Sequence, residues 1–196
     1  MKFLQLHELQ AISRALSFDT PDLRILGGCE IYTTKAAGSD KKLYKQISST
    51  LSSRYEADLE LSNSVSPQAS RAVYRTQHSP FGPLSEISAR KTFAYMIATL
   101  NASHPDYDFS SVLRPSDFRK ERSLRQVINT FNTTLTNLGV RGLARGKMWD
   151  SIDNEMKLRD CAVFSYAPED MADDAYGDEG LIWSNIYFFY NKQRKR

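Results

Sequence analysis

Asp106 and Asp108 are two carboxylates whose type and close spacing could support metal binding or acid–base catalysis. Two neighbouring carboxylates can hold a metal ion or share acid–base work. Alternate residues of an extended segment point to opposite sides, however, so this pair does not converge on one ion. The sequence also places no histidine, cysteine or third acid at ligand spacing. The pattern favours a surface loop or a helix cap over catalysis, and no metal or cofactor is expected.

A basic, glycine-containing stretch from Gly139 to Lys147 could bind phosphate or nucleic acid. It fails the P-loop pattern, because Arg141 replaces the first glycine and Met148 stands where Ser or Thr is required. Gly139 and Gly142 do match the GXXG loop with which KH modules clamp single-stranded nucleic acid. The stretch is too long for that module. A single-stranded nucleic-acid-binding module using this loop is therefore the alternative function, and nucleic acid is not expected as a direct ligand.

Composition limits the remaining classes of protein. At 196 residues, 41% of them hydrophobic, the chain suits one domain with a substantial core. Cys29 and Cys161 stand alone, which argues against a disulfide framework or zinc site and fits a reducing compartment. No apolar run reaches the length of a membrane helix, about 18 residues, and we expect no membrane association and no signal peptide. No G-x-S-x-G elbow is present, and no enzymatic activity is expected.

Charge is distributed unevenly, although the formal net charge is only +3. Six acids lie between Glu169 and Glu179, and four of the last five residues are Lys or Arg. A run of one sign usually forms a solvated face, but this segregation also fits surfaces for charged partners.

Apolar periodicity places the acidic pair at the exit of a helix. Arg90 and Lys91 stand at its entry, and His104-Pro105 ends it, because proline disfavours helical geometry in the preceding residue. The helix presents one apolar stripe, made of Phe93, Met96, Ile97 and Leu100.

Similar patterns predict the other elements. Helices are predicted over residues 3–16, 39–51, 124–138 and 148–156, with Ser123 as the cap of the third and Gly139 ending it. Strands are predicted within residues 23–34, 161–166 and 181–190, the last of them central in a sheet. The predicted fold class is α+β, a single globular domain whose central, mostly antiparallel β-sheet is packed by α-helices.

A segment rich in Ser, Thr, Gln and Pro divides the chain. It has too few apolar residues to offset the entropy of ordering, and we interpret residues 50–83 as a mobile, disordered internal linker. Residues 1–49 have too little structure to fold alone and are expected to complete the core of the main segment, residues 84–196.

Three stretches closely resemble the signature boxes of one known family. Residues 29–45 read CEIYTTKAAGSDKKLYK, residues 88–111 read SARKTFAYMIATLNASHPDYDFSS, and residues 180–196 join an aromatic strand to a basic cluster. In this order they resemble the Maf-type global repressors of RNA polymerase III transcription, a eukaryotic family, with this chain as a fungal-like member. Family members usually continue beyond the basic cluster with a further apolar strand and an acidic tail, so the resemblance implies either a C-terminal truncation after Arg196 or a divergent member.

The resemblance implies a function and several site residues. It implies a non-catalytic negative regulator that binds RNA polymerase III directly and blocks initiation of transfer RNA and 5S RNA transcription under stress and nutrient signals. Lys35 would be a natural partner for the acids of the second box. The residues expected to bind a partner or join segments are Lys35, Asp40, Lys41, Lys42, Arg90, Lys91, Asp106, Asp108 and Trp183.

The resemblance also implies control by modification and transport. Regulatory kinases and a phosphatase would act on the linker, with Ser66 and Ser79 as phosphorylation candidates. Nuclear import and export receptors would move the protein between nucleus and cytoplasm. The import candidates are Lys192, Arg194, Lys195 and Arg196.

Overall fold

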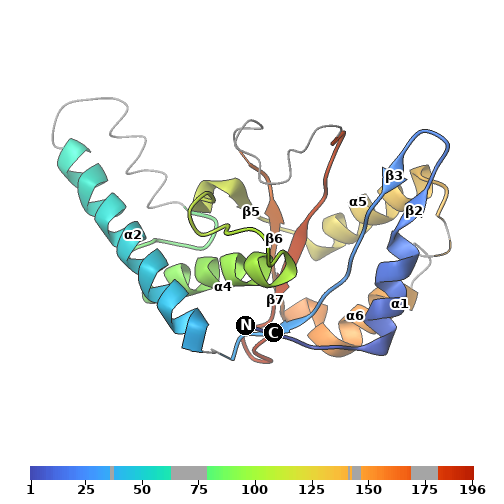
Figure 1. Ribbon diagram of the computed structural model, residues 1–196, viewed down its shortest axis with the longest axis horizontal. Coiled ribbons are helices and arrows are strands. Elements are labelled where there is room, and N and C mark those ends of the chain that lie inside the picture. Colours follow the sequence, from blue (N-terminus) through green and yellow to red (C-terminus); the bar gives the residue numbers. More distant parts are fainter. Residues whose placement is uncertain (36–37, 63–78, 141, 143–146, 169–180) are drawn as a thin grey trace. The chain divides into compact units, whose positions relative to one another are not determined.

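The computed structural model describes residues 1–35, 38–62, 79–140, 142, 147–168 and 181–196. These residues form helices and antiparallel strands, which confirms the predicted α+β class (Figure 1). The chain divides into two compact units. Unit 1 comprises Met1, Lys35–Lys120 and Phe164–Phe188, and unit 2 comprises Lys2–Thr34, Glu121–Val163 and Phe189–Arg196.

Unit 1 is built around helix α4 (Ile87–Ser103), against which α2 (Gly38–Ser62) packs (Figure 1). The predicted stripe of α4 is buried, and Ala94 and Ala98 bury a second side of the helix. Helix α2 turns its apolar side inward, with Ile47 and Leu51 buried one turn apart. A helix buried on several sides is the centre of its unit, and α4 has that role here.

Aromatic rings form the other half of the unit 1 core. Phe118, in β5 (Phe118–Lys120), lies at the centre of this cluster and is 3% exposed. Its ring centroid lies 5.6 to 5.9 Å from those of Phe81, Phe93, Tyr166 and Phe188. Tilted and edge-to-face contacts at this spacing are the favoured geometry for aromatic pairs. The cluster anchors the sheet to α4.

Unit 2 has a core of three helices, α1 (His7–Leu16), α5 (Leu124–Asn137) and α6 (Lys147–Met156). Two short antiparallel pairs accompany α1: β1 (Lys2–Phe3) with β4 (Tyr32–Thr33), and β2 (Phe18–Asp19) with β3 (Arg24–Ile25). The buried side chains shared by these elements are Leu9, Ile12, Leu16, Ile31, Leu135, Met148, Ile152, Met156 and Leu158.

The largest sheet has the strand order β5, β6 (Ala162–Tyr166), β7 (Tyr187–Tyr190). β5 and β6 are antiparallel, with Phe118 opposite Tyr166 and Lys120 opposite Phe164. The Tyr166 N–H donates to the Ile186 carbonyl at 3.0 Å, just before β7 begins. The described sheet therefore has β6 at its centre, and the prediction that residues 181–190 form the central strand is wrong: only Tyr187–Tyr190 form a strand, and it is an edge.

Other boundaries also differ from the predictions. The single strand predicted in residues 23–34 is two short strands, β3 and β4, each paired with a different partner. Helix α2 continues to Ser62, so the first third of the predicted linker, residues 50–62, is helical, and residues 63–78 lie outside the described residues. The wider division into 1–49, 50–83 and 84–196 stays a prediction. Among the described helices, none has the length and apolar character of a membrane span.

Candidate partner-binding surfaces

Arg90 is bound into unit 1 on two sides. Its Nε donates to the Ser48 hydroxyl of α2 at 3.1 Å, and its terminal guanidinium nitrogen donates to the Leu84 and Ser85 carbonyls at 2.7 and 2.9 Å. A guanidinium spreads its donors over several acceptors at once. Arg90 therefore joins α4, α2 and the turn before α4. Its predicted role in binding a partner or joining segments stays a prediction.

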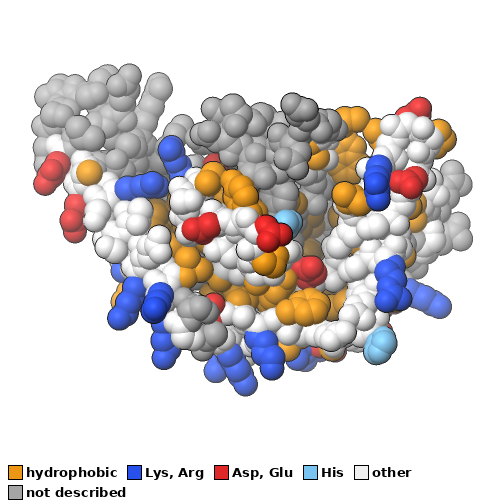
Figure 2. Space-filling view, viewed as in Figure 1, with side chains coloured by type: hydrophobic (Ala, Val, Ile, Leu, Met, Phe, Trp, Pro, Cys, Tyr) orange, Lys and Arg blue, Asp and Glu red, His pale blue; other side chains and the backbone are white. Residues whose placement is uncertain are grey.

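A basic face covers the first turns of α2. Lys41, Lys42 and Lys45 are exposed there at helical spacing, and Figure 2 shows Lys and Arg side chains gathered over this end of the helix. The Lys91 ammonium of α4 lies 5.8 Å from the centroid of the Tyr44 ring, a cation–π distance. The carboxylate of Asp40, in the first turn of α2, forms an ion pair with the Met1 α-amino group.

The acidic loop after α4 is held by local hydrogen bonds. One oxygen of Asp108 accepts from the Ser110 N–H at 2.9 Å and from the Ser110 hydroxyl at 2.7 Å. These bonds lower the pKa of the Asp108 carboxyl. Asn101 accepts from the Phe109 N–H at 2.9 Å and so holds the buried Phe109 ring under the loop. Asp106 is exposed. This arrangement supports the expected surface loop.

The described residues do not gather three or more His, Cys, Asp or Glu side chains into a group that could hold a metal ion.

An exposed apolar segment precedes β7. Leu181, Ile182 and Trp183 are 41%, 70% and 39% exposed. Three neighbouring apolar side chains in water are typical of a contact surface. Trp183 is therefore partly exposed to solvent, and its predicted contact with a partner stays a prediction.

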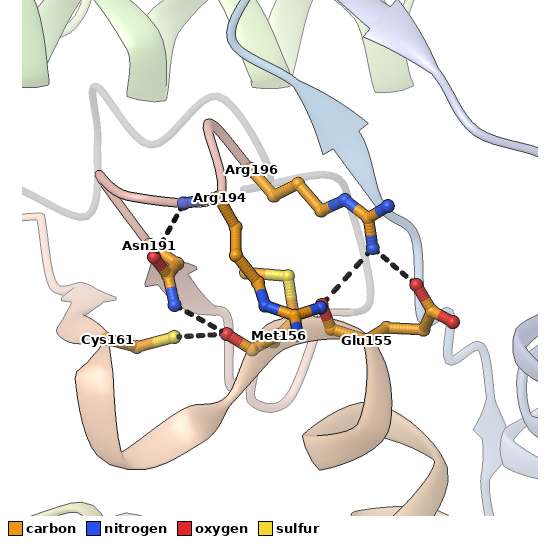
Figure 3. Close-up of polar contacts among 6 residues, drawn as sticks. All are labelled: Glu155, Met156, Cys161, Asn191, Arg194 and Arg196. Atoms are coloured by element: carbon orange, nitrogen blue, oxygen red, sulfur yellow. Dashed lines mark hydrogen bonds and ion pairs between the residues drawn. The ribbon is translucent and has the colours of Figure 1, made fainter.

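The C-terminal basic cluster is folded rather than extended. The backbone groups of Asn191 and Arg196 bond to each other at 2.8 and 3.2 Å and close a four-residue turn. The Asn191 side chain is 1% exposed; its amide donates to the Met156 carbonyl at 2.7 Å and its oxygen accepts from the Arg194 N–H at 2.9 Å. Figure 3 shows Arg194 and Arg196 directed at Glu155, near the end of α6.

These arginines complement the end of α6. Arg194 donates to the Glu155 carbonyl at 3.0 Å, and Arg196 donates to the same carbonyl at 3.2 Å and pairs with the Glu155 carboxylate. Carbonyls in the last turn of a helix lack helical partners, and cations stabilise that end of the dipole. Asn191, which organises this contact, was not among the predicted site residues. An amide between an aromatic strand and a basic cluster is the one sequence signal that could have indicated it.

Other predicted residues fall outside these surfaces. Lys35 is exposed, and its pairing with Asp106 or Asp108 stays a prediction. Ser79 is half-buried in a turn, where its hydroxyl donates to the Gly82 carbonyl, and Ser66 lies outside the described residues. Gly139 has φ of 84° at the end of α5, but most of the GXXG loop, residues 141 and 143–146, also lies outside them.

A cavity in unit 2 was also not predicted. It has a volume of about 300 Å³ and lies between β1, α1 and the segment before β4. Cys29 lines it, and burial, with a smaller effect of the Glu30 charge, raises the pKa of the Cys29 thiol to about 11. The Cys29 backbone is fixed at both ends, because Ser13 Oγ accepts from its N–H at 2.8 Å and donates to its carbonyl at 3.0 Å. The thiol is therefore protonated and held in place at neutral pH.

Known proteins resemble this chain along nearly its whole length. The family model described as "Maf1 regulator" matches residues 25–196. The "Repressor of RNA polymerase III transcription maf1" of Schizosaccharomyces pombe is 51% identical over 197 residues, which cover 100% of this chain and 79% of that protein. A "Repressor of RNA polymerase III transcription" of Dictyostelium discoideum is 31% identical over 231 residues, covering 100% and 82%. The crystal structure of citrus MAF1 in space group C 2 2 21 matches with a TM-score of 0.66 and 26% identity, covering 95% of this chain and 91% of that one.

Proposed function

This chain belongs to the Maf1 regulator family, and on that premise we propose that it is a negative regulator that represses transcription by RNA polymerase III. One observation carries the proposal: half of its residues are identical, over its full length, to a protein named for that repression. The regulator is non-catalytic in this proposal. It binds the polymerase directly and blocks initiation of transfer RNA and 5S RNA synthesis.

Several described surfaces support repression by occlusion. The exposed segment around Trp183 offers apolar contact area, and the basic face of Lys41, Lys42 and Lys45 offers charge. Interfaces commonly place an aromatic anchor at the centre and charged groups at the rim. Both features lie in unit 1, so in this proposal one folded unit supplies apolar and charged contacts to the polymerase.

Regulation by phosphorylation belongs to the same proposal. Kinases would act on Ser66 and Ser79, and a phosphatase would restore the repressor. A phosphate on Ser79 would remove its hydroxyl bond to Gly82 and place about two negative charges beside the turn that carries Phe81. The ring centroids of Phe81 and Phe164 lie 4.9 Å apart. Phosphorylation of Ser79 would therefore disturb the unit 1 core as well as the surface.

Transport between cytoplasm and nucleus is the remaining part of the proposal. The cations at positions 192–196 would bind an import receptor, and export receptors would return the protein. Receptors that read an extended peptide would first have to release the turn closed by Asn191 and Arg196. An Asn191→Ala variant should therefore bind such a receptor more tightly than the parent chain.

The test is retention of purified RNA polymerase III by the immobilised chain, with polymerases I and II as controls, measured in the absence and in the presence of nucleases. We expect selective retention of polymerase III. A Trp183→Ala variant should lose most of it, whereas Ile87→Ala, which also removes an exposed apolar side chain of unit 1, should keep it. Equal retention of all three polymerases, or none by a folded chain, would contradict direct repression. Retention that nucleases abolish would favour nucleic-acid binding instead.

A further inference from the structure

Two lysines have a backbone conformation that suits glycine. Among the described residues other than glycine, Lys157 and Lys195 are the two with positive φ, 53° and 55°. This left-handed region is unfavourable for a residue with a Cβ, because the Cβ crowds the next carbonyl. Lys157 directly follows the last residue of α6, where helices commonly carry glycine. The backbone gives no reason for lysine at either position, so the reason lies in the side chains.

The two lysines belong to neighbouring segments of unit 2. The bond from Asn191 to the Met156 carbonyl places the C-terminal turn beside the end of α6 (Figure 3). Lys157 is the residue that follows Met156 in the chain. The Thr34 N–H donates to the Lys195 carbonyl at 2.7 Å, and the preceding Thr33 pairs with Lys2 in the β1–β4 ladder. Three segments far apart in the sequence thus meet. We call their exposed cations the lysine surface: Lys2, Lys157, Lys192 and Lys195.

Two of the nearby acids are already engaged by other groups. Glu155 pairs with Arg196, and a carboxylate oxygen of Asp153 accepts from the Leu158 N–H at 2.8 Å. Asp160 is exposed, but Arg159 precedes it. Within the described part of the chain, none of the four ammonium groups of the lysine surface pairs with a carboxylate. The surface therefore carries uncompensated positive charge.

The chemistry of this surface favours carboxylates over nucleic acid. Arg194 and Arg196, whose planar forks would suit phosphate, are turned toward Glu155, which leaves lysines facing water. Binding of single strands also requires exposed aromatic rings on which bases stack. Phe3 is exposed, but it follows Lys2 in a strand, so the two side chains point to opposite faces.

We propose that the lysine surface binds a carboxylate-rich segment of a protein partner. The inference rests on the proposed function, because a regulator that acts by binding needs such an attachment point. The hydrogen bonds between Asn191 and Arg196 fix the backbone that carries Lys192 and Lys195 before binding, so little backbone order remains to be imposed there. Electrostatic attraction of this kind speeds association and selects acidic partners.

The test uses the full chain and a fluorescently labelled poly-glutamate peptide, with binding measured by anisotropy at about 50 mM and about 200 mM salt. The variant is the double substitution Lys157→Gly and Lys195→Gly. Loss of two interacting charges should weaken binding about tenfold at the lower salt concentration. The urea midpoint should not fall, because glycine accepts the left-handed backbone. The matched Lys157→Arg, Lys195→Arg variant keeps both charges and should bind like the parent chain.

The control variant Arg54→Gln, Lys120→Gln changes the net charge equally, but its two exposed side chains belong to α2 and β5, in unit 1. It should retain binding within about twofold, since the interaction of exposed charges is local. Equal loss in this control would overturn the proposal, and so would a fall in the urea midpoint of the glycine variant. Tighter binding of a single-stranded oligonucleotide than of the peptide would also overturn it. Because the probe is an isolated peptide, these outcomes are independent of polymerase retention.

Discussion

Replacing Asn191 by alanine should destabilise unit 2 without touching its hydrophobic core. The residue is almost completely buried. Its side chain donates to the Met156 carbonyl at the end of α6 and accepts from the Arg194 N–H within the C-terminal turn. Alanine removes both bonds. The Met156 carbonyl then loses its 2.7 Å donor, and the weak Cys161 thiol donor at 3.5 Å is the described group that remains on it.

The magnitude follows from these contacts. Each intramolecular hydrogen bond contributes about 1 kcal/mol net, and a buried acceptor left without a good partner costs about 1 to 3 kcal/mol more. The expected loss is about 3 kcal/mol of the free energy of unfolding. The free energy of unfolding of a small protein decreases by about 2 to 3 kcal/mol for each molar of urea, so the urea concentration at the midpoint of unfolding should fall by about 1 to 1.5 M.

Tryptophan fluorescence can follow unit 2 alone. The chain has two tryptophans, and Trp149 of α6 contacts Phe131 and Phe189, with ring centroids at 5.6 and 6.2 Å. In a Trp183→Phe background, its emission reports urea unfolding of this region. Gln193→Ala, an exposed change in the same turn, is the control and should move the midpoint by less than about 0.3 M. Equal shifts in the two variants would refute the argument that Asn191 organises the turn.

Three further predictions test other parts of the structure. Phe118→Ala should lower the free energy of unfolding by about 3 to 5 kcal/mol, because it empties the centre of the aromatic cluster; calorimetry showing a loss below about 1 kcal/mol would contradict that packing. The pKa of the Cys29 thiol is raised to about 11 from 9.0, so the stability that the protonated thiol contributes is complete below pH 9 and is lost as pH rises to 11. In urea titrations over this pH range, the free energy of unfolding of Cys29→Ala should fall less than that of the parent chain. An identical fall in both would refute this role of Cys29. The pKa of Asp108 is lowered from 3.8, so the stability that its carboxylate contributes is present above that pH and is lost below it. The melting temperatures of the parent and Asp108→Ala should therefore converge as the solution is acidified. A constant difference would count against a stabilising role of the Asp108–Ser110 hydrogen bonds.

Helices with a strong apolar period were predictable from the sequence. The ends of α4 at the His104-Pro105 pair and of α5 at Gly139 followed from proline and glycine chemistry, and Ser123 caps α5 by accepting from the Gln126 N–H. These features depend on residues close together in the chain. Local physics is therefore sufficient for them.

Features that depend on distant pairing could not be predicted. Strand β5 has three residues, too few for a period to show, and it exists because it pairs with β6. The aromatic run before Asn191 fits a central strand as well as an edge, and β6 decides between them. The second half of α2 is rich in serine and reads as linker, but Leu51 is buried beside α4.

The candidate surfaces divide in the same way. Composition indicated the basic residues of the C-terminal cluster, but not their fold, because the bond from Asn191 to Met156 joins residues 35 positions apart. The left-handed backbone of Lys157 and Lys195 has no signature in the sequence either. Sequence therefore identified charged groups, whereas their arrangement into a surface came from tertiary contacts.

Transcription with purified components tests the central claim most directly. RNA polymerase III and its initiation factors transcribe a transfer RNA gene in the presence of increasing amounts of the chain. The account predicts that the chain inhibits polymerase III on the promoter template and leaves polymerase II on its own promoter unaffected. Undiminished polymerase III transcription, at concentrations at which the folded chain is retained with the enzyme, would contradict it.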